Sequence, residues 1–423
     1  MPRIRIDGHK PLRGLIPISG AKNAVLKLMA AALMAPGESV IHNVPQIQDV
    51  STMIELLRTL GVGVEFDVNT LKLSVGDQIG EEAPHELVRK MRASIQVMGP
   101  LLGRLGRVRV SLPGGCAIGE RPIDFHLKGL SQLGTAIREE HGYIYAEASQ
   151  LQGADIQLDY PSVGATENLM MAAALADGVT QIRNAAREPE IIEIQNFLNQ
   201  MGARIRGAGT DVIRIDGVEG LRPAEHTVIP DRIEVGTYLI AAAMTGGHVT
   251  LQPTIPQHVA SLIAKLKETG VEVLVGEDKI MVHSNGEYQA MNFQSLPYPG
   301  FPTDLLPQIM AMMTLAVGTS VIRETVYTNR YKHVSELRRM GANIIIADRT
   351  AVVQGVTHLT GADVVVPDLR AGAALVLAAL AAEGSTIIED GGHLGRGYDN
   401  FVGKLQGVGA DIILLHATGQ AVL

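Results

Sequence analysis

The chain contains one cysteine, and the residues around it suggest chemistry. Cys116 stands in the segment Pro113-Gly114-Gly115-Cys116-Ala117-Ile118-Gly119-Glu120-Arg121-Pro122. Three glycines give this segment backbone freedom, a proline closes it at each end, and an arginine follows five residues after the thiol. The pattern is typical of a mobile loop that presents a reactive thiol to an anionic ligand. The alternative is a surface turn in which the cysteine is only a small apolar residue.

Basic residues recur where helices are expected to begin. A helix N-terminus carries partial positive charge and free N–H groups, so it attracts anions and is stabilised by acidic side chains. An excess of basic side chains at these places is therefore not explained by helix stability. The basic residues at these places are Lys22, Arg92, Arg330, Arg370 and Arg396, and the glycine loop adds Arg121. We expect them to converge on a ligand with several phosphates or carboxylates. Asp304, at another expected helix start, is either an N-cap or a functional carboxylate.

These residues sit within a repeat that occurs six times. A helix that ends at a glycine and is followed by two short strands recurs about every 70 residues. The glycine suits a left-handed helix cap. The six glycines are Gly61, Gly134, Gly202, Gly270, Gly341 and Gly409. Each repeat also contains an earlier helix that is apolar on nearly all sides and therefore buried. These helices are expected near residues 24–33, 93–102, 165–175, 235–244, 305–315 and 371–381.

The repeat predicts the fold class and the domain organisation. Each repeat consists of an apolar helix, a strand, an amphipathic helix and two strands, and it is longer than solenoid repeats usually are. We therefore expect two globular α/β domains of three repeats each, with helices in the centre and sheets outside. The expected domains are residues 22–229, which carry the Cys116 loop, and residues 230–423 together with 1–21. The active site is expected in the cleft between them. The first strand, residues 3–7, has no partner in its own repeat and is expected to complete the last one.

Composition excludes several other classes of protein. The net charge of −8, without a basic stripe, argues against nucleic-acid binding. One cysteine permits no internal disulfide, which fits a reducing compartment. No signal-peptide pattern opens the chain, and the longest apolar run, residues 371–382, is too short to span a bilayer. No phosphate-binding Walker loop, dinucleotide fingerprint or metal-binding Cys/His spacing is present. We expect a cytoplasmic protein without membrane insertion, cofactor or metal.

Several motifs of the chain occur together in one known enzyme family. They are Ser19-Gly20-Ala21-Lys22-Asn23-Ala24, residues 112–124 around Cys116, Ser162-Val163-Gly164-Ala165-Thr166, Asn184-Ala185-Ala186-Arg187-Glu188-Pro189-Glu190, Gly209-Thr210-Asp211, Pro230-Asp231-Arg232-Ile233-Glu234-Val235-Gly236, Phe301-Pro302-Thr303-Asp304 and Asp368-Leu369-Arg370. Through these motifs the full chain resembles the UDP-N-acetylglucosamine 1-carboxyvinyltransferases among the enolpyruvyl transferases. The resemblance implies an inside-out α/β barrel pair with three repeats in each domain. It also implies transfer of the enolpyruvyl group of phosphoenolpyruvate to the 3-hydroxyl of UDP-N-acetylglucosamine, with release of phosphate. This is the first committed step of peptidoglycan synthesis, on which cell wall, cell shape and cell division depend.

The resemblance also implies roles for single residues. Cys116 corresponds to the general acid, which can also hold the substrate covalently, Asp304 to the general base, and Lys22 to a third catalytic residue. The residues that correspond to the phosphoenolpyruvate site are Lys22, Asn23, Arg121, Arg330, Arg370 and Arg396. Those that correspond to the UDP-N-acetylglucosamine site are Asn23, Arg92, Arg121, Pro122, Ile123, Asp124, Phe125, Ser162, Val163, Gly164, Asp304 and Val326. Some members of the family carry a nucleotide-binding lysine where this chain has Tyr160.

Two other functions remain open at this point. The sister enzyme that transfers enolpyruvyl to shikimate 3-phosphate shares the six-repeat fold but lacks the cysteine loop. A non-catalytic relative would bind the nucleotide sugar without transferring anything to it, which the presence of Cys116, Lys22 and Asp304 argues against. Phosphate release with each acceptor distinguishes the three functions.

Overall fold

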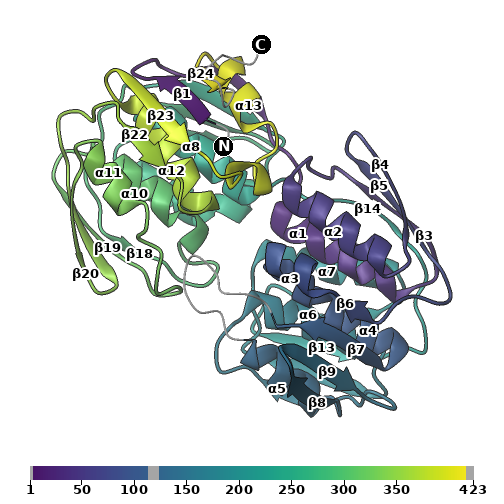
Figure 1. Cartoon of the computed structure of the whole chain (residues 1–423). Helices are drawn as coiled ribbons and strands as arrows, with labels where there is room; N and C mark the ends of the chain where they lie inside the picture. The colour runs from purple at the N-terminus through teal and green to yellow at the C-terminus, as the bar shows by residue number, and fades with distance from the viewer. Residues whose placement is uncertain (1–2, 113–122, 416–423) are drawn as a thin grey trace. The chain divides into compact units, whose positions relative to one another are not determined.

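The structure, a computed structural model, describes residues 3–112 and 123–415 and divides them into two compact units (Figure 1). Unit 1 contains residues 3–19 and 230–415, and unit 2 contains residues 20–112 and 123–229. The chain passes from unit 1 to unit 2 after Ser19 and returns after Ile229. Each unit has its own core of buried apolar side chains.

The apolar helices lie at the six expected places and are buried. In unit 2 they are α1 (Lys22–Ala31) with the 3₁₀ turn η1 (Ala32–Met34), the 3₁₀ helix η2 (Arg92–Val97) with α4 (Met98–Leu105), and α6 (Val163–Ala173). In unit 1 they are α8 (Arg232–Met244), the 3₁₀ turn η4 (Thr303–Leu305) with α10 (Leu306–Met313), and α12 (Leu369–Ala381). All 13 residues of α8 are buried, which is the environment that a helix without a polar face requires.

The second helix of each repeat is amphipathic and covers the buried helices. These helices are α2 (Gln48–Thr59), α5 (Asp124–Gln132), α7 (Pro189–Gln200), η3 (Pro256–Val259) with α9 (Ala260–Glu268), α11 (Val334–Arg339), and η5 (Leu394–Arg396) with α13 (Phe401–Gly407). A further short helix, α3 (His85–Lys90), precedes η2. In α9 only Leu262, Ile263 and Leu266 are buried, so its other faces are polar, as predicted.

The described strands form six sheets of four strands each, three in either unit. In unit 2 the first sheet has the strand order β14 (Glu225–Thr227), β3 (Gly37–His42), β5 (Thr70–Val75) and β4 (Gly63–Asp67). The second has the order β6 (Glu82–Ala83), β7 (Arg107–Ser111), β9 (Tyr143–Glu147) and β8 (Ala136–Glu140). The third has the order β10 (Asp155–Gln157), β11 (Val179–Arg183), β13 (Val212–Asp216) and β12 (Arg204–Arg206). In unit 1 the first sheet has the strand order β2 (Arg13–Pro17), β15 (His248–Gln252), β17 (Ile280–His283) and β16 (Glu272–Val275). The second has the order β18 (Phe293–Gln294), β19 (Thr319–Arg323), β21 (Thr350–Gln354) and β20 (Asn343–Ala347). The third has the order β22 (Asp363–Val365), β23 (Ser385–Glu389), β1 (Arg3–Asp7) and β24 (Asp411–Leu415).

Each sheet contains one strand more than the repeat predicted. The additional strand precedes a buried helix and pairs in parallel with the strand that follows a buried helix, as in β22, α12 and β23. Two of these edge strands are exchanged between distant repeats. β2 precedes α1 but pairs with β15, whereas β14 precedes α8 but pairs with β3. This exchange accompanies the two passages of the chain between the units.

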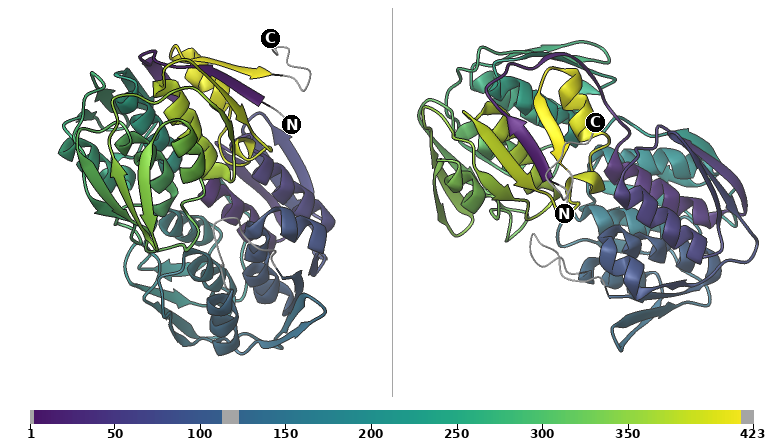
Figure 2. Two further views of the ribbon diagram at one scale, coloured as in Figure 1. Left: turned by 60° about the vertical axis from the view of Figure 1, so that its left-hand side comes forward. Right: turned by 45° about the horizontal axis from the view of Figure 1, so that its top comes forward.

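The first strand completes the last sheet, which confirms the prediction for residues 3–7. β1 lies between β23 and β24 and pairs antiparallel with both, so that Ile4 is opposite Ile388 on one side and Leu414 on the other. The right-hand view of Figure 2 shows the purple N-terminal strand beside the yellow C-terminal segment. The side chains of Ile4 and Ile6 are buried in the core of unit 1.

The six repeated glycines have the predicted left-handed conformation. Their φ angles are +88° at Gly61, +91° at Gly134, +108° at Gly202, +93° at Gly270, +97° at Gly341 and +92° at Gly409. A Cβ atom at any of these positions would meet nothing closer than 3.9 Å, the distance at Gly134. Glycine is therefore required by the backbone conformation and not by lack of space.

Candidate active site

Three of the candidate residues, Cys116, Arg121 and Pro122, lie outside the described residues. The others are divided between the two units. Asp304, Val326, Arg330, Arg370 and Arg396 belong to unit 1. Lys22, Asn23, Arg92, Ile123, Asp124, Phe125, Ser162, Val163 and Gly164 belong to unit 2.

In unit 1 the carboxylate of Asp304 is bound by two arginines. Arg330 Nη2 lies 2.5 Å from Asp304 Oδ1, and Arg370 Nη2 lies 3.1 Å from Oδ2. The two arginine side chains are almost fully buried, with 2% and 6% exposed, whereas the side chain of Asp304 is 25% exposed. Arg330 Nε also donates to the carbonyl of Thr303 at 3.0 Å, next to Asp304. The two cations favour the ionised carboxylate and fix its orientation while leaving part of it accessible.

The position of Arg370 follows from the way α12 begins. Asp368 is the N-cap of this helix and accepts from the backbone N–H groups of Arg370 and Ala371, at 3.0 Å each. Burial by itself lowers the pKa of the Arg370 guanidinium, but Asp304, Tyr398 and Asp231 outweigh it and raise the pKa above its usual value. Arg370 therefore remains a buried cation directed at Asp304.

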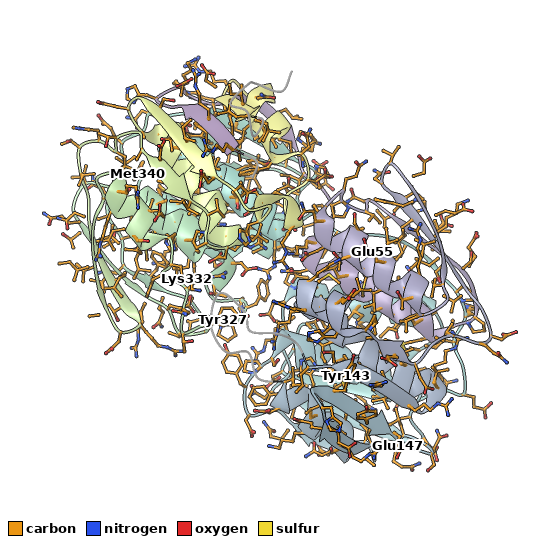
Figure 3. All side chains as sticks on the ribbon, in the orientation of Figure 1. Glu55, Tyr143, Glu147, Tyr327, Lys332 and Met340 are labelled. Atoms are coloured by element: carbon orange, nitrogen blue, oxygen red, sulfur yellow. The ribbon has the colours of Figure 1, made fainter. Side chains whose placement is uncertain are left out.

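A buried glutamate that we did not predict organises the loop of Val326. Glu324 is 1% exposed. Its Oε1 accepts from the backbone N–H groups of Val326 at 2.6 Å and Tyr327 at 3.0 Å, and its Oε2 accepts from the Thr303 hydroxyl at 2.8 Å. Figure 3 labels Tyr327 on this loop between β19 and α11. Glu324 thus links the Val326 loop to the turn that carries Asp304. Arg396 lies in η5, in the same unit.

In unit 2 the first turn of α1 presents Lys22 and Asn23. The Lys22 ammonium lies 2.8 Å from the carboxylate of Asp49 in the first turn of α2, and the two side chains are 11% and 5% exposed. One turn further along α1, Lys27 Nζ donates to the Asn23 carbonyl at 2.5 Å and lies 3.5 Å from Glu167 on α6. Burial raises the pKa of Glu167 to about 7; Lys27 lowers it, while Glu190 and Glu188 raise it. The starts of α1 and α6 are thereby connected through Lys27 and Glu167.

The remaining candidates of unit 2 lie at the starts of η2, α5 and α6, which meet around His126 and Asn168. Asn168 Nδ2 donates to Ile95 O at 3.2 Å and to His126 Nδ1 at 3.0 Å, and its Oδ1 accepts from Gly99 N–H at 2.5 Å. Burial, together with the charge of Arg92, lowers the pKa of His126 to about 3, so this histidine is neutral.

The start of α6 packs closely on the same cluster. Ser162 caps the helix by accepting from the Ala165 N–H, at 3.4 Å. A Cβ atom at Gly164 would lie 3.2 Å from both Gln96 Nε2 and His126 Nε2, so a larger residue here would push these side chains back by a few tenths of an ångström. Ile123 is buried, while Asp124 is exposed at the start of α5. Arg92, residues 123–125 and residues 162–164 are therefore brought together within unit 2.

The arrangement can bind anions and move a proton. Basic side chains at buried helix starts suit phosphates or carboxylates. A fixed and partly exposed carboxylate such as that of Asp304 can accept a proton from a hydroxyl group. Within residues 3–112 and 123–415, no three His, Cys, Asp or Glu side chains are grouped so that they could hold a metal ion. Among the helices in the described part of the chain, none has the length and apolar character needed to cross a membrane.

Comparisons with known proteins agree in one family. The family model of EPSP synthase (3-phosphoshikimate 1-carboxyvinyltransferase) matches residues 6–405. The UDP-N-acetylglucosamine 1-carboxyvinyltransferase 1 of Caldanaerobacter subterraneus subsp. tengcongensis is 56% identical over 407 residues, which cover 96% of this chain and 98% of that protein. The enzyme of the same name from Symbiobacterium thermophilum is 56% identical over 416 residues, 97% of this chain and 94% of that protein.

Solved structures show the same fold. The enolpyruvyl transferase NikO from Streptomyces tendae has a TM-score of 0.89 at 27% identity, covering 100% of this chain and 99% of its own. EPSP synthase from Acinetobacter baumannii has a TM-score of 0.74 at 18% identity, covering 98% of this chain and 100% of its own, and supports the fold alone. The expected inside-out α/β barrel architecture is confirmed.

Proposed function

We infer that this chain, which belongs to the EPSP synthase family, is a UDP-N-acetylglucosamine 1-carboxyvinyltransferase. It transfers the enolpyruvyl group of phosphoenolpyruvate to the 3-hydroxyl of UDP-N-acetylglucosamine and releases phosphate. The observation that carries this conclusion is 56% identity to enzymes of that name over nearly the whole chain. The sister activity on shikimate 3-phosphate belongs to relatives that are much more distant, at 18% identity.

The reaction requires a proton donor and a proton acceptor. We propose that Cys116 protonates C3 of the enol, which leaves C2 electron-poor, and that the 3-hydroxyl oxygen of the sugar bonds to C2. Asp304 takes the proton of that hydroxyl. Loss of phosphate and of a C3 proton then restores the enol double bond in the product. The role of Cys116 rests on the family resemblance, whereas that of Asp304 is also supported by its two arginine partners and its partial exposure.

The basic residues hold the anions in place while charge develops on phosphate. We assign Lys22, Arg121 and Arg396 to phosphoenolpyruvate. Lys22 begins a helix, where its ammonium and the free backbone N–H groups act on the same anion. Arg330 and Arg370 bind Asp304 in the structure, so we assign them first to orienting the base. Binding in a fixed geometry and electrostatic stabilisation then supply most of the catalysis.

The nucleotide sugar is assigned mainly to the helix starts of unit 2. Asn23, Arg92, residues 121–125 and residues 162–164 form this part of the proposed site, with Asp304 and Val326 from unit 1. The proposal therefore requires both units, divided at residues 229 and 230, to contribute to one active site. It places the reaction in the cytoplasm, at the first committed step of peptidoglycan synthesis, in line with the resemblance.

Phosphate release tests the proposed function. The protein is incubated with phosphoenolpyruvate and either UDP-N-acetylglucosamine or shikimate 3-phosphate. We expect phosphate only with UDP-N-acetylglucosamine. Release with shikimate 3-phosphate alone would assign the sister activity, and binding of UDP-N-acetylglucosamine without release would indicate a non-catalytic relative.

Two variants test the roles of single residues. Asp304→Ala is expected to abolish turnover while UDP-N-acetylglucosamine still binds, as measured by calorimetry. Asp155→Ala is the matched control, because Asp155 also binds an arginine, Arg183, at 2.7 and 3.1 Å but in an exposed pair on an outer sheet. Turnover near that of the wild type would reduce Asp304 to a structural role.

The thiol is tested separately from the base. The epoxide fosfomycin, added with UDP-N-acetylglucosamine, is expected to increase the mass of the protein by the mass of one fosfomycin molecule. Cys116→Ser is expected to remain unmodified. An unchanged wild-type mass would contradict a reactive Cys116.

A further inference from the structure

Tyr398 lies at the centre of a buried polar network beside the candidate base. It follows η5 by two residues and is 3% exposed. Its hydroxyl lies 3.0 Å from Thr237 Oγ1 on α8 and 3.2 Å from Gln308 Nε2 on α10. The guanidinium carbon of Arg370 on α12 lies 5.5 Å from the centre of the Tyr398 ring. The Tyr398 side chain therefore contacts residues of all three buried helices of unit 1.

The direction of each hydrogen bond follows from the available hydrogens. Thr237 Oγ1 donates its single hydrogen to the Ile233 carbonyl at 2.8 Å, so it can only accept from Tyr398. Gln308 Nε2 is a donor, so the Tyr398 oxygen accepts from it. The hydroxyl thus donates once and accepts once, and rotation about its C–O bond would break the bond to Thr237. These two hydrogen bonds fix the Tyr398 ring beside Arg370.

Arg370 contacts both the Tyr398 ring and the candidate catalytic carboxylate. Its Nη2 donates to Asp304 Oδ2 at 3.1 Å, and its guanidinium carbon lies 5.5 Å from the centre of the Tyr398 ring. The side chain is buried, so no bulk water is available to replace a lost partner. A change in the position of the Tyr398 ring is therefore transmitted to the orientation of Arg370 and of Asp304.

Two other buried tyrosines of the same unit lack such a connection. The hydroxyl of Tyr288 donates to the Met312 carbonyl at 3.2 Å. The hydroxyl of Tyr238 makes no hydrogen bond among the described residues. Both side chains are as buried as that of Tyr398, at 2% and 0% exposed. Burial alone therefore does not distinguish Tyr398, whereas its contact with Arg370 does.

We propose that Tyr398 is a positioning residue, whose ring, fixed by the two hydrogen bonds of its hydroxyl, holds Arg370 in the orientation that aligns Asp304 for proton removal from the sugar hydroxyl. This inference rests on the proposed function. It adds a residue that touches no substrate and acts through Arg370. It also explains why a tyrosine occupies this place, since phenylalanine would fill the same volume but lose the hydrogen bonds to Thr237 and Gln308 that fix the ring.

The test combines single variants with a double-mutant cycle. Tyr398→Phe is expected to lower kcat about tenfold, because the ring that positions Arg370 loses the two hydrogen bonds that fix it, with the KM for UDP-N-acetylglucosamine within about twofold of the wild type. Tyr288→Phe, which also removes one buried hydroxyl, is expected to leave kcat unchanged. In an Arg370→Lys background, Tyr398→Phe is expected to change the remaining kcat by less than about twofold, because the residue through which it acts is already altered.

Each outcome decides for or against the proposal. Full additivity in the cycle, a wild-type kcat in Tyr398→Phe, or an equal loss in Tyr288→Phe would overturn it. If Tyr398→Phe does not fold, as judged by circular dichroism, Thr237→Val replaces it. That variant keeps the volume and removes the acceptor that fixes the hydroxyl, and an unchanged kcat would overturn the proposal. An inactive wild type would refute the proposed function itself, a result distinct from any ratio between variants.

Discussion

His126 is expected to make unit 2 sensitive to acid. The imidazole is 5% exposed, accepts a hydrogen bond from Asn168, and faces the positive charge of Arg92. These surroundings lower its pKa from 6.5 to about 3. Between these two values the unfolded chain binds a proton at this histidine and the folded chain does not. The stability that His126 contributes is therefore complete above pH 6.5 and is lost as the pH falls towards 3.

The size of the effect follows from the distance between the two pKa values. Each pH unit below 6.5 costs about 1.4 kcal/mol, so the loss at pH 5 is about 2 kcal/mol. In His126→Gln an amide oxygen can still accept from Asn168, but the side chain cannot be protonated. The free energy of unfolding of this variant, relative to the wild type, is therefore expected to improve by about 2 kcal/mol from pH 7.5 to pH 5.

Calorimetry can measure this difference in the full chain. A change of about 2 kcal/mol in a unit of this size moves Tm by about 4–8 °C, and only the transition of unit 2 should move. His85→Gln is the matched control, because His85 is exposed in the same unit and bonds the Ser111 hydroxyl. A stability difference between His126→Gln and the wild type that stays constant from pH 7.5 to pH 5 would refute the reasoning.

Three further predictions concern other buried residues. The pKa of Glu167 is raised to about 7, so its contribution to stability should change with pH in the opposite sense to that of His126. The free energy of unfolding of Glu167→Gln, measured in urea, is therefore expected to rise by about 3 kcal/mol relative to that of the wild type from pH 4.5 to pH 8. No rise would contradict the raised pKa. Glu324→Ala removes the acceptor of two backbone N–H groups in the Val326 loop, so the KM for UDP-N-acetylglucosamine should rise about tenfold. An unchanged KM would show that this loop does not bind the sugar. Ile6→Ala should destabilise unit 1 by about 2–5 kcal/mol and leave the calorimetric transition of unit 2 in place, with the exposed Leu15→Ala as the neutral control.

Much of the fold could be predicted because it repeats. The glycine caps and apolar helices recur at nearly equal spacing, so each occurrence supported the others. The edge strands were missed because several are only two or three residues long, such as β6 and β18, and too short for an alternating pattern. The exchange of β2 and β14 could not be predicted, because nothing within a repeat indicates which distant strand will pair with its edge.

The candidate site shows the same limit. Asp304 could be singled out as a carboxylate at a helix start, but its partners Arg330 and Arg370 are 26 and 66 residues away. Their pairing depends on the way η4, the loop before α11 and the start of α12 pack together, and not on local spacing. Glu324, His126 and Asn168 were missed because a single polar residue in a helix or loop has no local signal of burial. Their roles come from contacts with residues far away in the sequence, such as those of Asn168 with Ile95 and Gly99, and from their isolation from water.

The insertion of β1 between β23 and β24 has a consequence for biosynthesis. The ribosome makes this strand first and its two neighbours last, so residues 3–7 must wait for residues 385–389 and 411–415 before their backbone groups are paired. The segment made in between, residues 20–229, contains all of unit 2 and can fold while the rest is synthesised. A truncated nascent chain therefore yields one finished half and one half that lacks its closing strands, and an early stop codon leaves an open sheet edge where β24 should lie.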